Sequence, residues 1–303
     1  MEELERKQIL KKAILNYRLF FVLVPAFLFL FFLIFEIFSE YFPDIKEKYP
    51  EANLLFLAYF PLFFIALFFL NRYLNYLKKQ NIKFENYIKE KLVSKFLKNY
   101  TYNPADGFGS NFINNVEIYA YYDFATHDLV KGFYKDTKFE FCIAETCENY
   151  TSVGGDFGKL INGLKKMKYE LSKFTGVILG FAIDKNFKSK TIIVDKSYNT
   201  KINGKKEIFD NSTFNDEFRI FSDDAVEARY LLSFLDMEKI VNFQNTIGAG
   251  QASYAFINGK FYIFLNNYHF SYNPSLFFEV NEKDAINFAQ NIKKVISFID
   301  YFK

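Results

Sequence analysis

Two long apolar runs near the N-terminus constrain this chain more than any other feature. Residues 19–38 carry no charge before Glu36, and in residues 52–70 only Asn53 is strongly polar. A helix needs about 20 mostly apolar residues to cross the roughly 30 Å of hydrocarbon in a bilayer. The two runs therefore predict a two-helix transmembrane hairpin.

Two other interpretations explain these runs less well. A pair of buried core helices would rarely place two runs of this length in one short stretch of chain. A cleaved signal peptide has a shorter apolar core followed by small residues, whereas Phe38 and Tyr41 are bulky. We therefore expect an uncleaved membrane anchor.

The charged residues around the two runs predict how the hairpin is oriented. Flanks of membrane helices on the cytoplasmic side carry an excess of Lys and Arg. Residues 1–18 and 71–83 are rich in both, whereas the loop at residues 39–51 holds two lysines among four acidic residues. Both termini are therefore expected on the cytoplasmic side, with a small acidic loop on the other side.

About 230 of the 303 residues follow the second apolar run, which is enough for a large folded domain. We expect a short cytoplasmic segment at residues 1–18, a juxtamembrane helix at residues 71–100 and a cytoplasmic α+β domain at residues 101–303. The net charge is +3, and the basic excess lies beside the predicted membrane spans. A nucleic-acid-binding protein should instead carry its basic residues on the folded domain, so we expect no nucleic-acid partner.

The juxtamembrane helix has an apolar side and a lysine-rich remainder that includes Lys89. Such a helix could contact anionic headgroups of the lipid bilayer. The interpretation that we favour is a positively charged flank that continues into a stalk.

Period-two alternation and turn signals predict a mixed antiparallel sheet in the domain. Strands are expected at residues 116–124, 138–143, 174–183, 191–194 and 218–221. A polar stretch at residues 200–211 is expected to be a surface loop.

The clearest local signal is a β-hairpin at residues 252–265. Two apolar runs flank Asn258-Gly259, the preferred type I′ turn, in which both central residues need a positive φ.

Three helices are expected around the strands. One begins at Asp224, where Asp224 and Glu227 resemble a capping box. Another covers residues 236–245. The last begins at Asn281 and continues toward the C-terminus, with apolar residues at helical spacing on one side.

No motif for catalysis, cofactor binding or metal binding stands out. Cys142 and Cys147 have no further ligands at zinc-site spacing, so two plain thiols are expected, with no metal and no cofactor. The glycine-rich stretch at residues 154–159 lacks the spacing of a phosphate-binding loop. A Ser/His/Asp triad stays open, because its members need not be close in sequence.

His127 and Asp128 are adjacent in a predicted extended segment. Consecutive side chains on a strand point to opposite faces, so we favour a surface role for this pair. His127, Asp128 and Arg229 are kept as speculative functional residues. Arg229 could pair with an acidic residue such as Glu279.

Three pieces of the sequence together resemble a family of bacterial membrane proteins known as domain of unknown function 3137. They are residues 128–145, residues 174–191, and residues 218–233 followed by the hairpin at Asn258-Gly259 and by residues 277–279. The resemblance covers roughly residues 80–303 and implies an integral protein of the bacterial inner membrane. It brings no catalytic residues. It also implies a LemA-like membrane protein as a partner.

The main functional hypothesis is a non-enzymatic scaffold whose domain binds another protein through exposed aromatic residues. The candidate contact residues are Tyr254, Tyr262, Tyr268, His269, Phe270 and Tyr272. Two alternatives are a domain that binds a lipid or another apolar ligand, and an enzyme that acts on membrane-derived substrates through His127 and nearby carboxylates.

Overall fold

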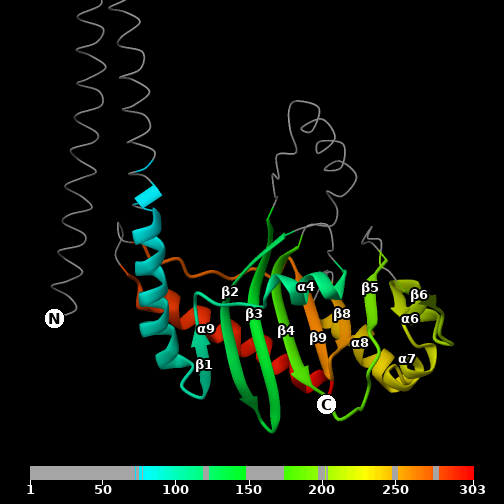
Figure 1. Cartoon of the computed structure of the whole chain (residues 1–303). Coiled ribbons are helices and arrows are strands. Elements are labelled where there is room, and N and C mark those ends of the chain that lie inside the picture. Colours follow the sequence, from blue (N-terminus) through cyan, green and yellow to red (C-terminus); the bar gives the residue numbers. More distant parts are fainter. Residues whose placement is uncertain are drawn as a thin grey trace, which may run out of the picture. The chain divides into compact units, whose positions relative to one another are not determined.

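A computed structural model describes most of the chain beyond the two apolar runs (Figure 1). The described residues are Arg72, Asn75, Tyr76, 78–118, 123–147, 174–196, 202, 204–247, 252–275 and 280–303. Both predicted membrane spans lie outside them. A search of the described part finds no helix with the length and apolarity that a membrane crossing needs.

Two compact units divide the chain. One comprises residues 1–87 with 273–280, and the other comprises residues 88–272 with 281–303. Residues 78–96 are helical and contribute to both units.

The second unit is built on an antiparallel sheet of nine strands. Their order across the sheet is β1-β2-β3-β4-β9-β8-β5-β7-β6, and every neighbouring pair runs antiparallel. The strands are β1 (Tyr100–Asn103), β2 (Asp123–Tyr134), β3 (Thr137–Cys147), β4 (Thr175–Ala182), β5 (Thr191–Asp195), β6 (Lys205–Glu207), β7 (Phe218–Ser222), β8 (Ala252–Ile257) and β9 (Lys260–Asn266).

Short helices join the strands, and a long helix lies near the C-terminus. They are α4 (Ser110–Val116), α6 (Ser212–Glu217), α7 (Ala225–Leu231), α8 (Phe234–Ile247), α9 (Glu282–Ser297) and the 3-10 helix η2 (Phe298–Tyr301). The expected α+β class, antiparallel sheet and C-terminal helix are therefore confirmed.

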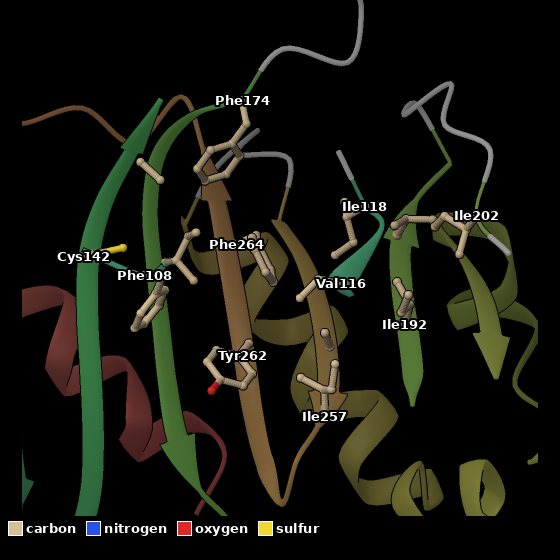
Figure 2. Packing of buried hydrophobic residues seen from close by; sticks show 14 of the residues in the cluster. Phe108, Val116, Ile118, Cys142, Phe174, Ile192, Ile202, Ile257, Tyr262 and Phe264 are labelled. Carbon is tan, nitrogen blue, oxygen red and sulfur yellow. The ribbon is translucent and has the colours of Figure 1, made fainter. Parts of the chain in front are cut away.

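Both faces of the sheet are buried at β8, where all six residues are buried although their side chains alternate between the two faces. On β3, Cys142 enters a core cluster with Phe174, Tyr262 and Phe264, which Figure 2 shows in close view. That face also receives Phe108, from the segment before α4.

The opposite face of the sheet contacts the C-terminal helix. Phe141 on β3 stacks with Phe270, whose ring meets Phe288 of α9 at 5.5 Å. Phe243 of α8 meets Phe298 of η2 at 5.1 Å between ring centroids. Helix α8 therefore contacts the 3-10 helix that follows α9.

The hairpin and the helix starts follow the sequence signals. Asn258 and Gly259 have φ values of +52° and +74°, as the turn requires. Asn281 caps α9 by accepting a hydrogen bond from the Lys283 amide. The strands predicted at residues 138–143, 174–183, 191–194 and 218–221 are confirmed.

Two predictions of secondary structure are wrong. The stretch 116–124 is not a strand throughout, since Val116 ends α4 and Glu117 has a positive φ of 63°. The side chains of Val116 and Ile118 both enter the core cluster. Their spacing of two residues is also that of neighbouring side chains on one face of a strand, which explains the wrong prediction. The polar stretch 200–211 contains the edge strand β6, because pairing with β7 uses the backbone and needs no apolar side chain.

Candidate functional site

The backbone of β2 bends at Asp128, and this bend creates a buried polar centre. The register between β2 and β3 shifts between His127 and Val130, and Asp128 has a left-handed φ of +58°. The Asp128 amide donates to the carbonyl of Pro104, at 3.2 Å. A bulge of this kind re-aims side chains, so His127 and Asp128 can meet instead of pointing apart.

Three donors converge on the Asp128 carboxylate. His127 Nδ1 lies 2.6 Å from Asp128 Oδ2, and Lys89 Nζ donates to the same oxygen at 3.1 Å. The Tyr102 hydroxyl donates to Oδ1. We call these four residues the Asp128 centre. Its members come from the helix at residues 78–96, from β1 and from β2, so the centre joins three elements.

The Asp128 centre is deeply buried on one side and open on the other. The side chains of Lys89 and Asp128 are 4% and 0% exposed, whereas that of His127 is 39% exposed. Lys89 Nζ also lies 5.7 Å from the centroid of the Phe288 ring of α9. The ammonium is thereby held between a carboxylate and an aromatic face, which compensates in part for its lost hydration.

The pKa of Asp128 is lowered despite its burial. Burial alone raises this pKa, but the hydrogen bond with His127, the positive charge of Lys89 and the Tyr102 hydroxyl together outweigh it. Asp128 is therefore charged in the folded protein near neutral pH.

The geometry favours a structural cross-link over catalysis. In a general-base arrangement, a carboxylate orients one imidazole nitrogen while the other nitrogen takes a proton from the nucleophile. Asp128 and His127 make the first of these two contacts. Here the carboxylate also binds Lys89 and Tyr102, so its charge is already compensated. Within the described residues, no group of three or more His, Cys, Asp and Glu side chains could hold a metal ion.

The surface role predicted for the pair of His127 and Asp128 is wrong for Asp128, which is fully buried, whereas the His127 side chain is 39% exposed. The two side chains also meet, although they were expected to point apart. The sequence did not indicate that Lys89 and Tyr102 join them. The sequence pattern predicts that Lys89 lies on the polar side of its helix. In the structure its side chain is buried. Lys89 lies seven residues before Phe96 and thus on nearly the same side of the helix, a signal that a helical projection would have shown.

Three of the six candidate contact residues are not on the surface. Tyr254, Tyr262 and Tyr272 are buried, so the expectation that they are exposed is wrong. The Tyr254 ring stacks on Phe261 at 5.8 Å.

The burial of Tyr262 depends on a neighbouring glycine. A Cβ on Gly180 would lie 2.3 Å from the Tyr262 ring, and the Tyr262 hydroxyl reaches across β4 to donate to Glu140 Oε1 at 2.9 Å. Of the other candidates, Tyr268 and Phe270 are half-buried and His269 is exposed. Strands of this sheet have two covered faces, which the alternation in one hairpin did not reveal.

Arg229 is exposed on α7 and contacts a different residue from the expected one. Its Nη2 lies 3.9 Å from Glu207 Oε2 on β6, and the suggested partner Glu279 lies outside the described residues. Asp224 caps α7 as predicted, but Glu227 does not complete a capping box. The Glu227 carboxylate instead accepts hydrogen bonds from the amides of Lys188 and Ser189.

The two cysteines and the glycine-rich stretch offer no site in the described residues. Cys142 is a free, buried thiol, and burial raises its pKa to about 12. A thiol with so high a pKa is a poor nucleophile. The side chain of Cys147 and residues 154–159 lie outside the described part.

Comparison with known proteins supports the family resemblance over part of the chain. Residues 172–303 match the model of a family described as "Protein of unknown function (DUF3137)". The resemblance stated from the sequence is confirmed over this range, which begins later than the expected residue 80. No curated protein matches the chain.

A solved structure with some similarity is the crystal structure of the mycobacterial trehalose monomycolate transport factor A, TtfA. The two chains share 5% identity with a TM-score of 0.30, over 71% of this chain and 96% of that one. Similarity at this TM-score supports no inference about the present chain.

Proposed function

We propose that this protein is anchored in the inner membrane of a bacterium by its two apolar runs and that its cytoplasmic α+β domain binds another protein without catalysing a reaction. The observation that carries the proposal is the buried pair of Lys89 and Asp128, 3.1 Å apart. It fixes residues 88–96 of the helix onto the sheet.

A flexible tether would not need a buried ion pair. Removing one partner of such a pair leaves an uncompensated charge, and this costs roughly 3–5 kcal/mol. The Asp128 centre therefore holds residues 88–96 of the helix on the sheet of the same unit. An ordered attachment of this kind suits a domain that must present one surface to a partner, and a LemA-like membrane protein is our candidate for that partner.

The orientation in this proposal rests on the distribution of Lys and Arg. Residues 1–18 and 71–83 hold the basic excess, so both termini and the domain are placed in the cytoplasm.

Two measurements on the tagged full-length protein test the proposal. Membranes washed with alkaline carbonate should retain the protein in the pellet, as integral proteins are retained. Affinity purification after gentle detergent extraction should enrich a second protein in stoichiometric amount, relative to an unrelated tagged membrane protein. Release by carbonate would overturn the anchor, and purification without a second protein would overturn the binding role.

A further inference from the structure

The ends of β2 and β3 next to their shared turn leave part of one sheet face exposed. Lys131 and Phe133 lie on the same side of β2, and Lys138 on β3 is the residue opposite Phe133. Phe133 is 65% exposed, and both lysines are exposed as well. Helix α4 lies in front of the sheet farther from this turn, and no described helix lies in front of the turn end itself (Figure 1). We call Lys131, Phe133 and Lys138 the basic face.

Glu140 and Lys260 border the basic face and neutralise each other. Glu140 lies opposite Lys131 in the register of β2 and β3. Its Oε1 accepts a hydrogen bond from Lys260 Nζ at 2.8 Å and another from the Tyr262 hydroxyl at 2.9 Å. Within the part of the chain that the structure describes, neither Lys131 nor Lys138 forms an ion pair. The basic face therefore keeps two uncompensated positive charges.

Phe133 adds an exposed aromatic ring beside the two ammonium groups. A single exposed apolar residue is common on protein surfaces and needs no explanation by itself. Phe133 differs because one lysine of the basic face lies two residues before it on the strand and the other lies directly opposite it. Aromatic side chains are enriched at protein interfaces, where the ring contributes contact area. The basic face therefore combines an aromatic contact with two positive charges.

The spacing of the two lysines determines the spacing of the groups that would bind them. Lys138 is two residues before Glu140, the residue that lies opposite Lys131. Diagonal neighbours of this kind on two antiparallel strands are roughly 7–8 Å apart. Alternate residues of an extended chain are about 6.6 Å apart and point to the same side. Two acidic residues separated by one position would therefore each reach one lysine.

Three other occupants fit the charge of the basic face less well. A nucleic-acid-binding surface neutralises several phosphates at once, and the basic face offers only two uncompensated charges. Adhesion to anionic lipid headgroups usually takes a cluster of about four to eight Lys and Arg residues. In a two-fold pairing with a second copy the basic face would meet itself, so positive charge would oppose positive charge. A short acidic segment needs no more than the two lysines provide.

We propose that the basic face docks a short acidic segment of another protein. One carboxylate of the segment binds Lys131, a second binds Lys138, and an apolar side chain of the partner covers the Phe133 ring. This inference rests on the proposed function and names the surface and the chemistry of the partner. Charge attraction selects the acidic segment, and the aromatic contact fixes where it lies.

Photo-crosslinking in the full-length protein tests this docking. Phe133 is replaced by p-benzoylphenylalanine in cells of the native host, and the matched control carries the same group at Val226 of α7, which is 77% exposed. Thr101, exposed and opposite Lys131, is a second probe position in case the change at Phe133 itself weakens docking. We expect adducts from positions 133 and 101 at least about tenfold stronger than from position 226, because the probe reacts only with groups that it contacts. The captured peptide should carry two acidic residues separated by one position.

Charge changes show whether the two lysines are recognised. Lys131→Glu with Lys138→Glu should reduce the adduct and the co-purified partner at least about tenfold, because two attractions become repulsions. Lys131→Arg with Lys138→Arg should preserve both. Lys206→Glu with Lys283→Glu makes the same change in net charge at exposed lysines of β6 and α9 and should leave both unchanged. Changing the acidic residues of the captured peptide to lysine should restore the adduct of the Glu variant.

The Glu variant should unfold at the same urea concentration as wild type. If it is less stable, Lys131→Gln with Lys138→Gln, which only removes the charges, takes its place.

Several results would overturn the docking surface. They are an adduct with lipid, with nucleic acid or with a second copy, no adduct at either position 133 or position 101, or an adduct that ignores the charge changes. If a stoichiometric partner still co-purifies in those cases, the binding role stands and only the assigned surface is wrong. If no partner co-purifies, both proposals fail.

Discussion

Lys89 and Asp128 are separated by 39 residues in sequence and meet in a buried ion pair of 3.1 Å. One residue belongs to the helix beyond the predicted membrane anchor, and the other lies at the bulge of β2, next to the edge strand β1. The pair explains why the Lys89 side chain is buried, whereas other lysines of the same helix are exposed. The contribution of this pair to the free energy of unfolding can be measured directly.

Removal of the ammonium alone should be strongly destabilising. Lys89→Met leaves Asp128 buried with an uncompensated charge, and the free energy of unfolding should fall by roughly 3–5 kcal/mol. Unfolding of the full-length protein by urea in detergent, followed by tyrosine fluorescence, measures the change.

Two further variants control the Lys89→Met experiment. Lys95→Met removes an exposed lysine of the same helix and should alter stability by less than about 0.5 kcal/mol. Adding Asp128→Asn to Lys89→Met should recover part of the loss, since the buried charge is gone. A Lys89→Met protein as stable as wild type would show that the pair does not hold the helix.

The lowered pKa of Asp128 predicts an acid-sensitive contribution to stability. In the unfolded chain an aspartate has a pKa near 3.9. Because the folded pKa lies below that value, the contribution is complete above about pH 5 and is lost as the pH falls through the folded pKa. The stability difference between wild type and Asp128→Asn should therefore shrink as the pH falls below 4. A difference that stays constant down to pH 3 would contradict the assignment.

The buried thiol of Cys142 should not react with alkylating reagents in the folded protein. With the pKa raised to about 12 by burial, Cys142 should not react with iodoacetamide at pH 8. The chain has two cysteines, so a Cys147→Ser variant keeps Cys142 as its single thiol. Mass spectrometry should find no label before unfolding and one label in guanidinium chloride. Rapid labelling of the native protein would mean that this core face is open.

Two glycines should respond differently to replacement by alanine. A Cβ on Gly176 would lie 1.9 Å from the Leu265 carbonyl oxygen, so Gly176→Ala must push β4 and β9 apart and should cost several kcal/mol. Gly259 has open space around it but a φ of +74°, so Gly259→Ala should cost only about 1 kcal/mol of backbone strain. Equal thermal stability of the two variants would contradict the close strand approach at Gly176.

Local chemistry made much of the fold predictable from the sequence. Asn258-Gly259 has few alternatives to a tight hairpin, and Asn281 caps its helix through its own side chain. Such signals act within a few residues, and at these two positions the long-range packing agrees with them.

The polar centre could not be predicted in the same way, because tertiary contacts create it. Asp128 adopts a left-handed φ only because the bulge is supported by the loop at Pro104. Glu227 satisfied the spacing of a capping box, yet it binds the amides of residues 188 and 189, which lie 38 or more positions away. Nothing local to either residue indicates these partners.

A native mass spectrum of the full-length protein, extracted gently from its own membrane, tests the central claim most directly. Our account predicts a complex whose mass exceeds that of the 35.9 kDa chain by the mass of a second protein. That added mass should be released when the complex is activated in the gas phase. A bare monomer, or a chain carrying only a small mass such as a lipid, would contradict the proposal that the domain serves to bind another protein.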